Sequence, residues 1–117
     1  MTGSAAFIAI AEKCEAQTDS YGPSFDREIA RIFGGEIAGA FSQSVDAAAL
    51  LLGKGWVWMR FSATSMSVYR GDPAIKPVMR FDGYHKSPAL ALVAAICRAK
   101  ADSLAIAEKS SARTVLA

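Results

Sequence analysis

The first half of the chain spaces its hydrophobic residues as amphipathic helices do. Residues 4–16 place apolar side chains three and four positions apart on one helical face, and Ser4 can cap its start. A second helix is predicted over 24–33, with Gly34 and Gly35 ending it. The inward positions of these two helices are Phe7, Ile10, Ala11 and Cys14, then Phe25, Ile29, Ile32 and Phe33.

A short third helix is predicted over 45–52, with Ser44 as its N-cap and Gly53 after its end. Residues 36–41 are expected to be a linker or an irregular turn. The first helix has an alternative role. Because its apolar face is mostly alanine, residues 1–22 could form a weakly held N-terminal arm.

The pattern changes to that of β-strands after Gly55. Aromatic and aliphatic residues fill 56–61, and apolar and polar residues alternate over 66–70. A third strand is predicted over 78–81, after a turn at 71–73. Successive side chains of a strand point to opposite faces. The first strand therefore has Trp56, Trp58 and Arg60 on one side and Val57, Met59 and Phe61 on the other.

A long helix is predicted from about Pro88 to Lys109. Ser87 can accept hydrogen bonds from the first turn, and Pro88 at the first helical position loses only a donor that has no partner there. The run of alanine and leucine that follows makes a slim apolar surface that can lie flat on a sheet. Residues 110–117 are expected to fray.

These elements predict an α+β fold, with a small three-stranded antiparallel sheet layered with helices. Three short strands with tight connections form a meander, which needs helical cover on one face or on both. The length of 117 residues predicts a single domain over 1–117, with its core over 23–109.

Composition and charge narrow the class of protein. The chain is 52% hydrophobic and 21% charged, as expected of a folded globule. Residues 1–53 carry a net charge of −4, whereas residues 54–117 carry +6. The basic half could face nucleic acid or an acidic protein, or it could neutralise the acidic half of its own fold.

No segment predicts export or membrane insertion. The N-terminus lacks a basic signal region, and no apolar run approaches the roughly 18 residues of a membrane span. Cys14 and Cys97 lie far apart in sequence, and we expect them to be buried reduced thiols of a cytoplasmic protein rather than a disulfide.

Four segments, in order, resemble a known family. They are residues 25–30 (FDREIA), 41–48 (FSQSVDAA), 55–56 (GW) and 87–92 (SPALAL). Together they resemble the phage ABA-sandwich proteins, small domains encoded by phages and prophages, over residues 25–101. The resemblance implies a phage origin and an alpha-beta-alpha sandwich, and it implies no activity.

Candidate catalytic residues are few. His85 is the only histidine, so any histidine-based metal site or proton relay would depend on one ring. Cys97 could pair with it as a nucleophile, but Cys97 lies within an apolar helical face, where a cysteine usually packs as a small hydrophobe. Gly34-Gly35 lacks the residues of a phosphate-binding loop. We therefore expect no enzyme activity, no metal and no cofactor.

Candidate binding residues are better represented. The three strands carry one arginine each, with lysines nearby, and several of these cations could share one edge or face of the sheet with tryptophans. The expected partner-binding residues are Trp56, Trp58, Arg60, Arg70, Lys76, Arg80, His85 and Lys86. An alternative acidic surface consists of Asp26, Glu28 and Glu36. Helices on both faces of the sheet would instead bury both tryptophans.

The leading hypothesis is a phage or prophage accessory protein that binds a host or phage protein, for example to inhibit a bacterial defence complex of the CRISPR type. The same cations and aromatic residues could instead hold nucleic acid, by contacts to phosphates and stacking on unpaired bases. A third hypothesis is a structural or assembly protein that forms a homodimer through the alanine-rich faces of its first and last helices.

Overall fold

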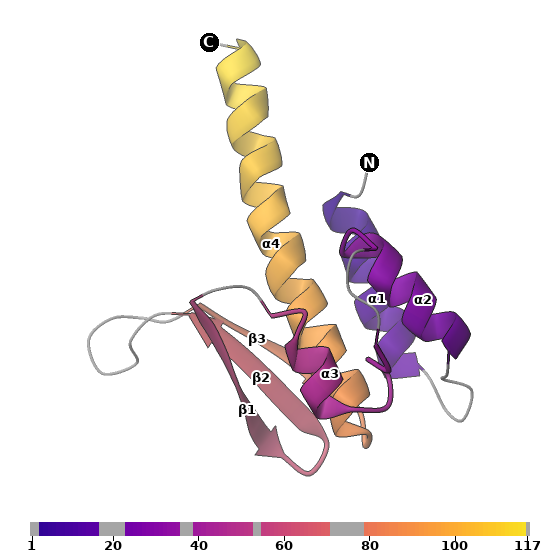
Figure 1. The fold of residues 1–117 in the computed structure, drawn as a ribbon. Coiled ribbons are helices and arrows are strands. Elements are labelled where there is room, and N and C mark those ends of the chain that lie inside the picture. The colour runs from indigo at the N-terminus through magenta and orange to yellow at the C-terminus, as the bar shows by residue number, and fades with distance from the viewer. Residues whose placement is uncertain (1–2, 17–22, 36–38, 53–54, 71–78, 117) are drawn as a thin grey trace.

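The structure is a computed structural model that describes residues 3–16, 23–35, 39–52, 55–70 and 79–116 (Figure 1). Within these residues, four helices and three strands form an α+β fold, as the sequence predicts. In chain order they are α1 (Ser4–Ala16), α2 (Pro23–Ile32), α3 (Val45–Ala49), β1 (Trp56–Ser62), β2 (Ser65–Arg70), β3 (Met79–Tyr84) and α4 (Pro88–Leu116).

The strands form an antiparallel sheet in the order β1-β2-β3. Directly paired residues share a face, so the register assigns each side chain. The face that we call the helix face carries Trp56, Trp58, Arg60, Met66, Val68, Arg70, Met79, Phe81 and Gly83. The opposite face, called the open face, carries Val57, Met59, Ser62, Ser65, Ser67, Tyr69, Arg80, Asp82 and Tyr84. The pairing register shifts by one residue between Arg60 and Ser62, which leaves Phe61 in a β-bulge.

Helix α4 lies on the helix face in very close contact. A Cβ atom added to Gly83 would meet the carbonyl oxygen of Ala91 at 1.9 Å and the amide nitrogen of Ala95 at 2.8 Å. Only a glycine in β3 opposite alanines in α4 permits this approach. The alanine run of the sequence is therefore explained by a helix packed backbone to backbone on the sheet.

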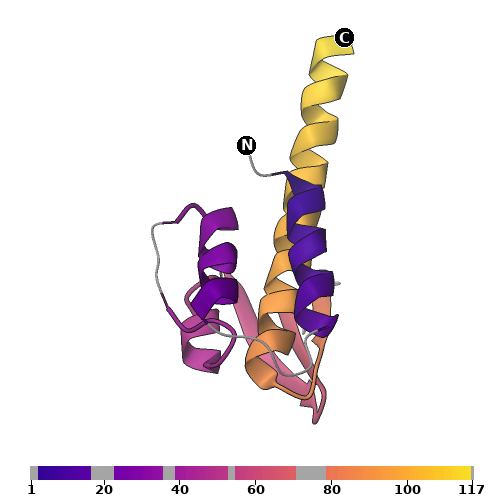
Figure 2. The same cartoon turned by 90° about the vertical axis from the view of Figure 1, so that its right-hand side faces the viewer.

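Helix α1 packs along α4, and the two views in Figures 1 and 2 place it beside that helix. Helix α1 buries Ala11, and α4 is buried on every side from Ala89 to Cys97. Of the two alanine-rich faces expected to form a homodimer, the face of α4 is thus packed against other elements of the same chain, whereas Ala5, Ala9 and Ala16 of α1 are exposed. Because Phe7 and Ile10 are part of the core, α1 is not a weakly held arm.

The described helices all lie on the helix-face side of the sheet, since α4 contacts β2 and β3 and the other helices pack around α4. The family resemblance implies helical layers with the sheet between them. In the described residues, the second helical layer instead packs on α4, on the same side of the sheet. Consistent with this arrangement, Phe61 and Tyr84 are exposed. The C-terminal half of α4 projects beyond the remaining elements (Figure 1).

A buried carboxylate joins α2 to the turn that precedes α3. Asp26, only 7% exposed, accepts a hydrogen bond of 2.7 Å from the backbone N–H of Ser42. Gly34 and Gly35 follow α2 with φ angles of 103° and 74°, which favour glycine and end the helix as predicted. Ser44 caps α3, its hydroxyl accepting a hydrogen bond from the N–H of Ala47.

Three element ends differ from the prediction by more than one residue. Helix α3 ends at Ala49 rather than at residue 52, because the N–H groups of Leu51 and Leu52 bond to carbonyls three residues back, as in turns. Strand β3 continues through 82–84, which the sequence analysis assigned to a connection, because these residues pair with β2. Helix α4 continues to Leu116, past the end predicted at about Lys109. The predicted turn at 71–73 lies outside the described residues, as do residues 36–38 of the linker predicted over 36–41.

Neither cysteine is in a disulfide. Cys14 and Cys97 are fully buried and free, as expected. Burial raises the pKa of the Cys14 thiol to about 12 and the pKa of the Cys97 thiol well above its usual value. Among the described helices, none combines the length and the hydropathy needed to cross a membrane.

Candidate interaction surface

Large hydrophobic side chains are exposed on the open face. Val57 and Met59 of β1 are 47% and 45% exposed, and Phe61 at the bulge is 59% exposed. Tyr84 at the end of β3 is 56% exposed. No described helix covers these residues, so they form one apolar and aromatic surface on a rigid sheet.

A hydrogen-bonded carboxylate lies at the centre of this face. Asp82 accepts hydrogen bonds from Ser67 Oγ at 2.6 Å, Arg80 Nε at 3.0 Å and the Tyr84 hydroxyl at 3.3 Å. Desolvation raises the pKa of Asp82, but these hydrogen bonds and the charge of Arg80 outweigh it and lower the pKa overall. Asp82 is therefore ionised and neutralises Arg80.

Arg80 also lies against an aromatic ring of β1. Its guanidinium carbon is 4.2 Å from the centroid of the Phe61 ring, so the side chain reaches across β2. The small serines of β2 lie beneath the larger neighbours, with Ser67 only 1% exposed. The contacts to Asp82 and Phe61 fix the position of Arg80 in advance of any binding.

The predicted binding residues divide between the two faces of the sheet. Arg60 and Arg70 lie on the helix face, at opposite ends of the sheet, whereas Arg80 lies on the open face. Arg60 and Arg70 therefore share a face with both tryptophans, and only Arg80 of the three arginines is separated from them. The reason is the register of the hairpins, because Arg80 pairs with Tyr69 rather than with its neighbour Arg70. Lys76 lies outside the described residues.

The two tryptophans share the helix face, as the alternation predicts. Trp56 is partly buried, with its ring centroid 6.0 Å from that of Phe81. Trp58 remains 39% exposed, because β1 extends past the part of the sheet that α4 covers. Helical cover therefore does not bury both tryptophans.

His85 and Lys86 lie where β3 turns into α4. The Nδ1 atom of His85 accepts a hydrogen bond of 2.8 Å from the backbone N–H of Ser87, which is the residue before the helix. His85 thus has a structural role at the start of α4. Lys86 is exposed beside it.

The alternative acidic surface is not formed by the described residues. Asp26 is buried and bonded to the backbone of Ser42. Glu28 pairs with Lys13 of α1 at 2.6 Å. Glu36 lies outside the described residues. The two placed carboxylates hold α2 to its neighbours and do not form a negative patch.

The two edges of the sheet differ in their cover. At the β3 edge, Glu15 of α1 accepts a hydrogen bond of 2.8 Å from the N–H of Tyr84. Arg98 of α4 donates to the carbonyl of Asp82 at 2.8 Å and to Glu15 Oε1 at 2.6 Å. The hydrogen bond from Arg98 lowers the pKa of Glu15. No described element covers the outer edge of β1 in this way (Figure 1).

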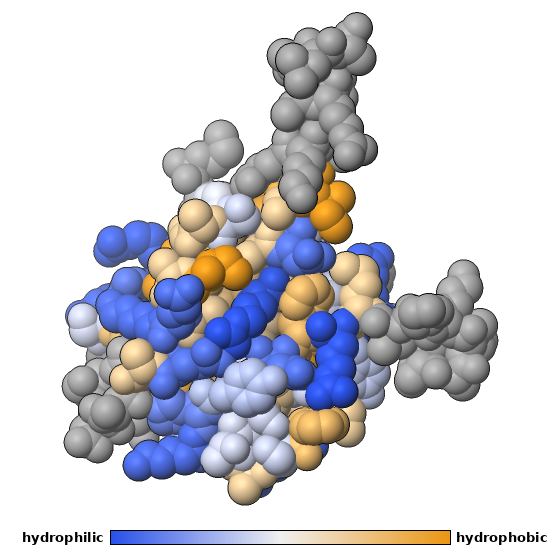
Figure 3. Space-filling view, turned by 180° about the vertical axis from the view of Figure 1, so that it is seen from behind, coloured by the Kyte–Doolittle hydropathy of each residue, from blue (hydrophilic) through white to orange (hydrophobic). Residues whose placement is uncertain are grey.

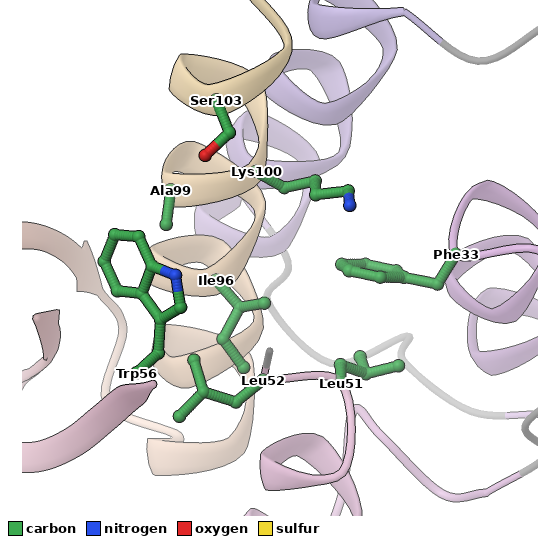
Figure 4. A pocket seen from close by; sticks show the side chains of 8 residues that line it. All are labelled: Phe33, Leu51, Leu52, Trp56, Ile96, Ala99, Lys100 and Ser103. Atoms are coloured by element: carbon green, nitrogen blue, oxygen red, sulfur yellow. The ribbon is translucent and has the colours of Figure 1, made fainter. Parts of the chain in front are cut away.

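A pocket lies on the helix-face side, between α4 and the start of β1 (Figure 4). Its volume of about 150 Å³ is below the roughly 300–1,000 Å³ of typical ligand sites. Apolar side chains form most of its wall, and Lys100 lies at its rim. The lining residues are Phe33, Leu51, Leu52, Trp56, Ile96, Ala99, Lys100 and Ser103.

The side of the molecule opposite to the view of Figure 1 has a mixed surface. In the space-filling view from behind, hydrophobic side chains form separate patches divided by hydrophilic ones (Figure 3). Within the part of the chain that the structure describes, no three residues of the His, Cys, Asp and Glu types could hold a metal ion together.

Sequence reasoning missed Asp82 and Tyr84 as surface residues, because it assigned them to a connection. The signal was present: Arg80, Asp82 and Tyr84 alternate with Met79, Phe81 and Gly83, as in a strand with one polar face. Compared with family models, curated proteins and solved structures, the chain matches none of them, so the resemblance to phage ABA-sandwich proteins stays a prediction.

Proposed function

We propose that this chain has a non-enzymatic function and acts by binding another protein on the open face of its sheet. The observation that carries the proposal is the exposure of Val57, Met59, Phe61 and Tyr84 around the bonded pair of Arg80 and Asp82. Aromatic residues, methionine and arginine are the types enriched in the centres of protein interfaces.

The chemistry of the surface favours an apolar partner surface. Since Asp82 neutralises Arg80, the open face presents apolar side chains with little net charge. The partner would therefore present its own apolar or aromatic side chains and need no strong charge. Nucleic acid is less favoured, because Arg60 and Arg70 are on the other face and cannot follow one phosphate backbone together with Arg80.

The resemblance to phage proteins extends this proposal to the kind of partner. We propose a protein of the bacterial host or of the phage, with a host defence complex as one example. The surface itself carries no feature that selects among these partners, so the experiment must identify the protein.

The test is affinity capture from nuclease-treated bacterial lysate with the chain and matched variants. Phe61→Ala and Tyr84→Ala remove exposed rings from the open face, and Leu50→Ala removes a side chain of similar exposure at the end of α3. We expect one dominant protein to be retained by the unmodified chain and by Leu50→Ala, and each ring variant to weaken its binding about tenfold or more.

Two results would contradict the proposal. Equal retention of the protein by the ring variants would exclude the open face as its binding site. Loss of all captured material on nuclease treatment would favour the nucleic-acid hypothesis, and the salt dependence of binding to a single-stranded DNA or RNA probe would then measure the phosphate contacts.

A further inference from the structure

We infer that two copies of this chain pair through the outer edges of β1, which joins their sheets into one continuous antiparallel sheet. This inference goes beyond the proposed function and does not rest on it. It follows from three features of the strand: an uncovered edge, the direction of its backbone groups and a sequence that is complementary to itself.

Residues 56–60 of β1 form an edge without the proline, lysine or bulge that often prevents strand pairing. The strand is seven residues long, its one charged residue is Arg60, and its bulge at Phe61 lies beyond this segment. Six of its seven residues are exposed, on both faces of the sheet. Long, exposed, hydrophobic edges readily accept another strand. At the β3 edge, by contrast, Glu15 and Arg98 occupy the backbone groups of Tyr84 and Asp82.

The backbone groups of β1 that point outward can be derived from the opposite edge. In β3, the N–H of Tyr84 and the carbonyl of Asp82 point away from the sheet, toward Glu15 and Arg98. Backbone groups alternate between the two sides of a strand. This alternation can be followed from β3 to β2 and from β2 to β1 through the residue pairs. It shows that three residues of β1 have N–H and C=O groups that point away from the sheet. They are Trp56, Trp58 and Arg60.

The regular part of β1 is complementary to itself about Trp58. In an antiparallel pair centred there, Trp58 lies opposite the Trp58 of the second copy, and Trp56 lies opposite Arg60. Both of these pairs, and the symmetry-related pair of Arg60 with Trp56, are of the hydrogen-bonded kind, in which two residues exchange both backbone hydrogen bonds. Arg60 meets an indole ring rather than another arginine, which favours cation–π contact.

On the open face, the side chains of the two paired strands are equally compatible with each other. Val57 of one copy lies opposite Met59 of the second copy on the open face, and both are exposed in the single chain. The bulge at Phe61 lies beyond this five-residue segment, so it does not interrupt the pairing. The match between the segment and its own reverse favours a second copy over an unrelated extended peptide as the occupant of this edge.

Sedimentation velocity over a concentration series tests the inference. The chain has a mass of 12.4 kDa, and we expect a species of twice that mass to grow with concentration. Trp58→Lys places two ammonium groups opposite each other at the centre and should weaken association about tenfold or more. Leu50→Lys adds the same charge at an exposed site on another element and should leave association unchanged.

Cysteine cross-linking tests the register and covers the case in which Trp58→Lys fails to fold. Trp58→Cys should form a disulfide-linked dimer under mild oxidation, because the two introduced residues are directly opposite. Val57→Cys and Met59→Cys should cross-link when the two variants are mixed, and much less when each is alone. The native thiols are buried and do not compete.

A chain that stays monomeric over the whole series would overturn the inference, as would association that Trp58→Lys leaves unchanged. Cross-linking with another pattern of positions would overturn the register. Phe61→Ala distinguishes this inference from the proposed function, since Phe61 lies outside the paired segment. That variant should lose the partner protein and keep the dimer.

Discussion

Replacing Gly83 with alanine tests the packing of α4 on the sheet. The added methyl group would lie 1.9 Å from the carbonyl oxygen of Ala91, whereas an ordinary contact is about 3.4 Å or longer. The obstacle is backbone, which cannot rotate away as a side chain can. Helix α4 would therefore have to move by roughly 1.5 Å, or β3 would have to leave the sheet locally.

The expected change in the free energy of unfolding is the sum of opposing contributions. Overpacking a close-packed site costs typically 1–3 kcal/mol, and loss of contact between α4 and buried residues such as Val68 adds to it. Alanine lowers the entropy of the unfolded chain, which offsets about 0.4–1 kcal/mol. We expect a net loss of about 2–3 kcal/mol in the free energy of unfolding for Gly83→Ala. For a domain of this size that corresponds to a fall in Tm of about 8–12 °C.

Urea unfolding followed by tryptophan fluorescence and by circular dichroism measures this loss. Gly39→Ala is the matched control, because its added methyl group would meet only side-chain atoms, the nearest at 3.2 Å from Phe41. We expect Gly39→Ala to change stability by less than about 1 kcal/mol. If Gly83→Ala were as stable as Gly39→Ala, the close approach of α4 to β3 described above would be refuted.

Three further predictions concern buried groups. Ser42→Ala should leave stability unchanged or raise it by up to about 1 kcal/mol in urea unfolding, because the buried Ser42 hydroxyl has no hydrogen-bond partner in the described structure; a loss above 1 kcal/mol would contradict this. Glu15→Gln should destabilise the fold at pH 7, since Arg98 loses its charged partner. The pKa of Glu15 is lowered in the folded state, so its stabilisation is present above its usual pKa of about 4.5 and is lost as pH falls through the folded pKa. The stability difference between Glu15→Gln and the unmodified chain should therefore shrink in urea titrations below pH 4.5, and a difference independent of pH would refute this. Finally, iodoacetamide at pH 8 should alkylate Cys14 and Cys97 slowly in the folded chain and rapidly in urea, measured by mass spectrometry; rapid labelling of the folded chain would show that these thiols are accessible.

Much of the fold follows from local sequence signals. The cap at Ser44, the proline that begins α4, the glycines after α2 and the alternation in β1 each locate an element through local chemistry. The class and the order of elements could therefore be predicted. Strand β3 was predicted too short, because Gly83 is typical of a turn and its role depends on the distant alanines of α4.

The candidate surface depends on contacts between residues that are distant in the sequence, so local patterns could not predict it. Which face of the sheet stays open is decided by α4, and the separation of Arg80 from Arg60 and Arg70 is decided by the register across two hairpins. Composition drew attention to the residues of β1. It could not show that Asp82 neutralises Arg80, since that contact depends on the strand assignment.

The position of α4 at the centre of the fold has a consequence for the order of folding. Each of its neighbours precedes it in the chain, and the ion pair between Arg98 and Glu15 spans 83 residues. During synthesis, α1 and the sheet are made before the helix on which both pack. Such contacts of high sequence separation slow folding. The interval before α4 is complete is therefore when the hydrophobic residues of β1 and of the helix face are most open to misassociation or to capture by chaperones.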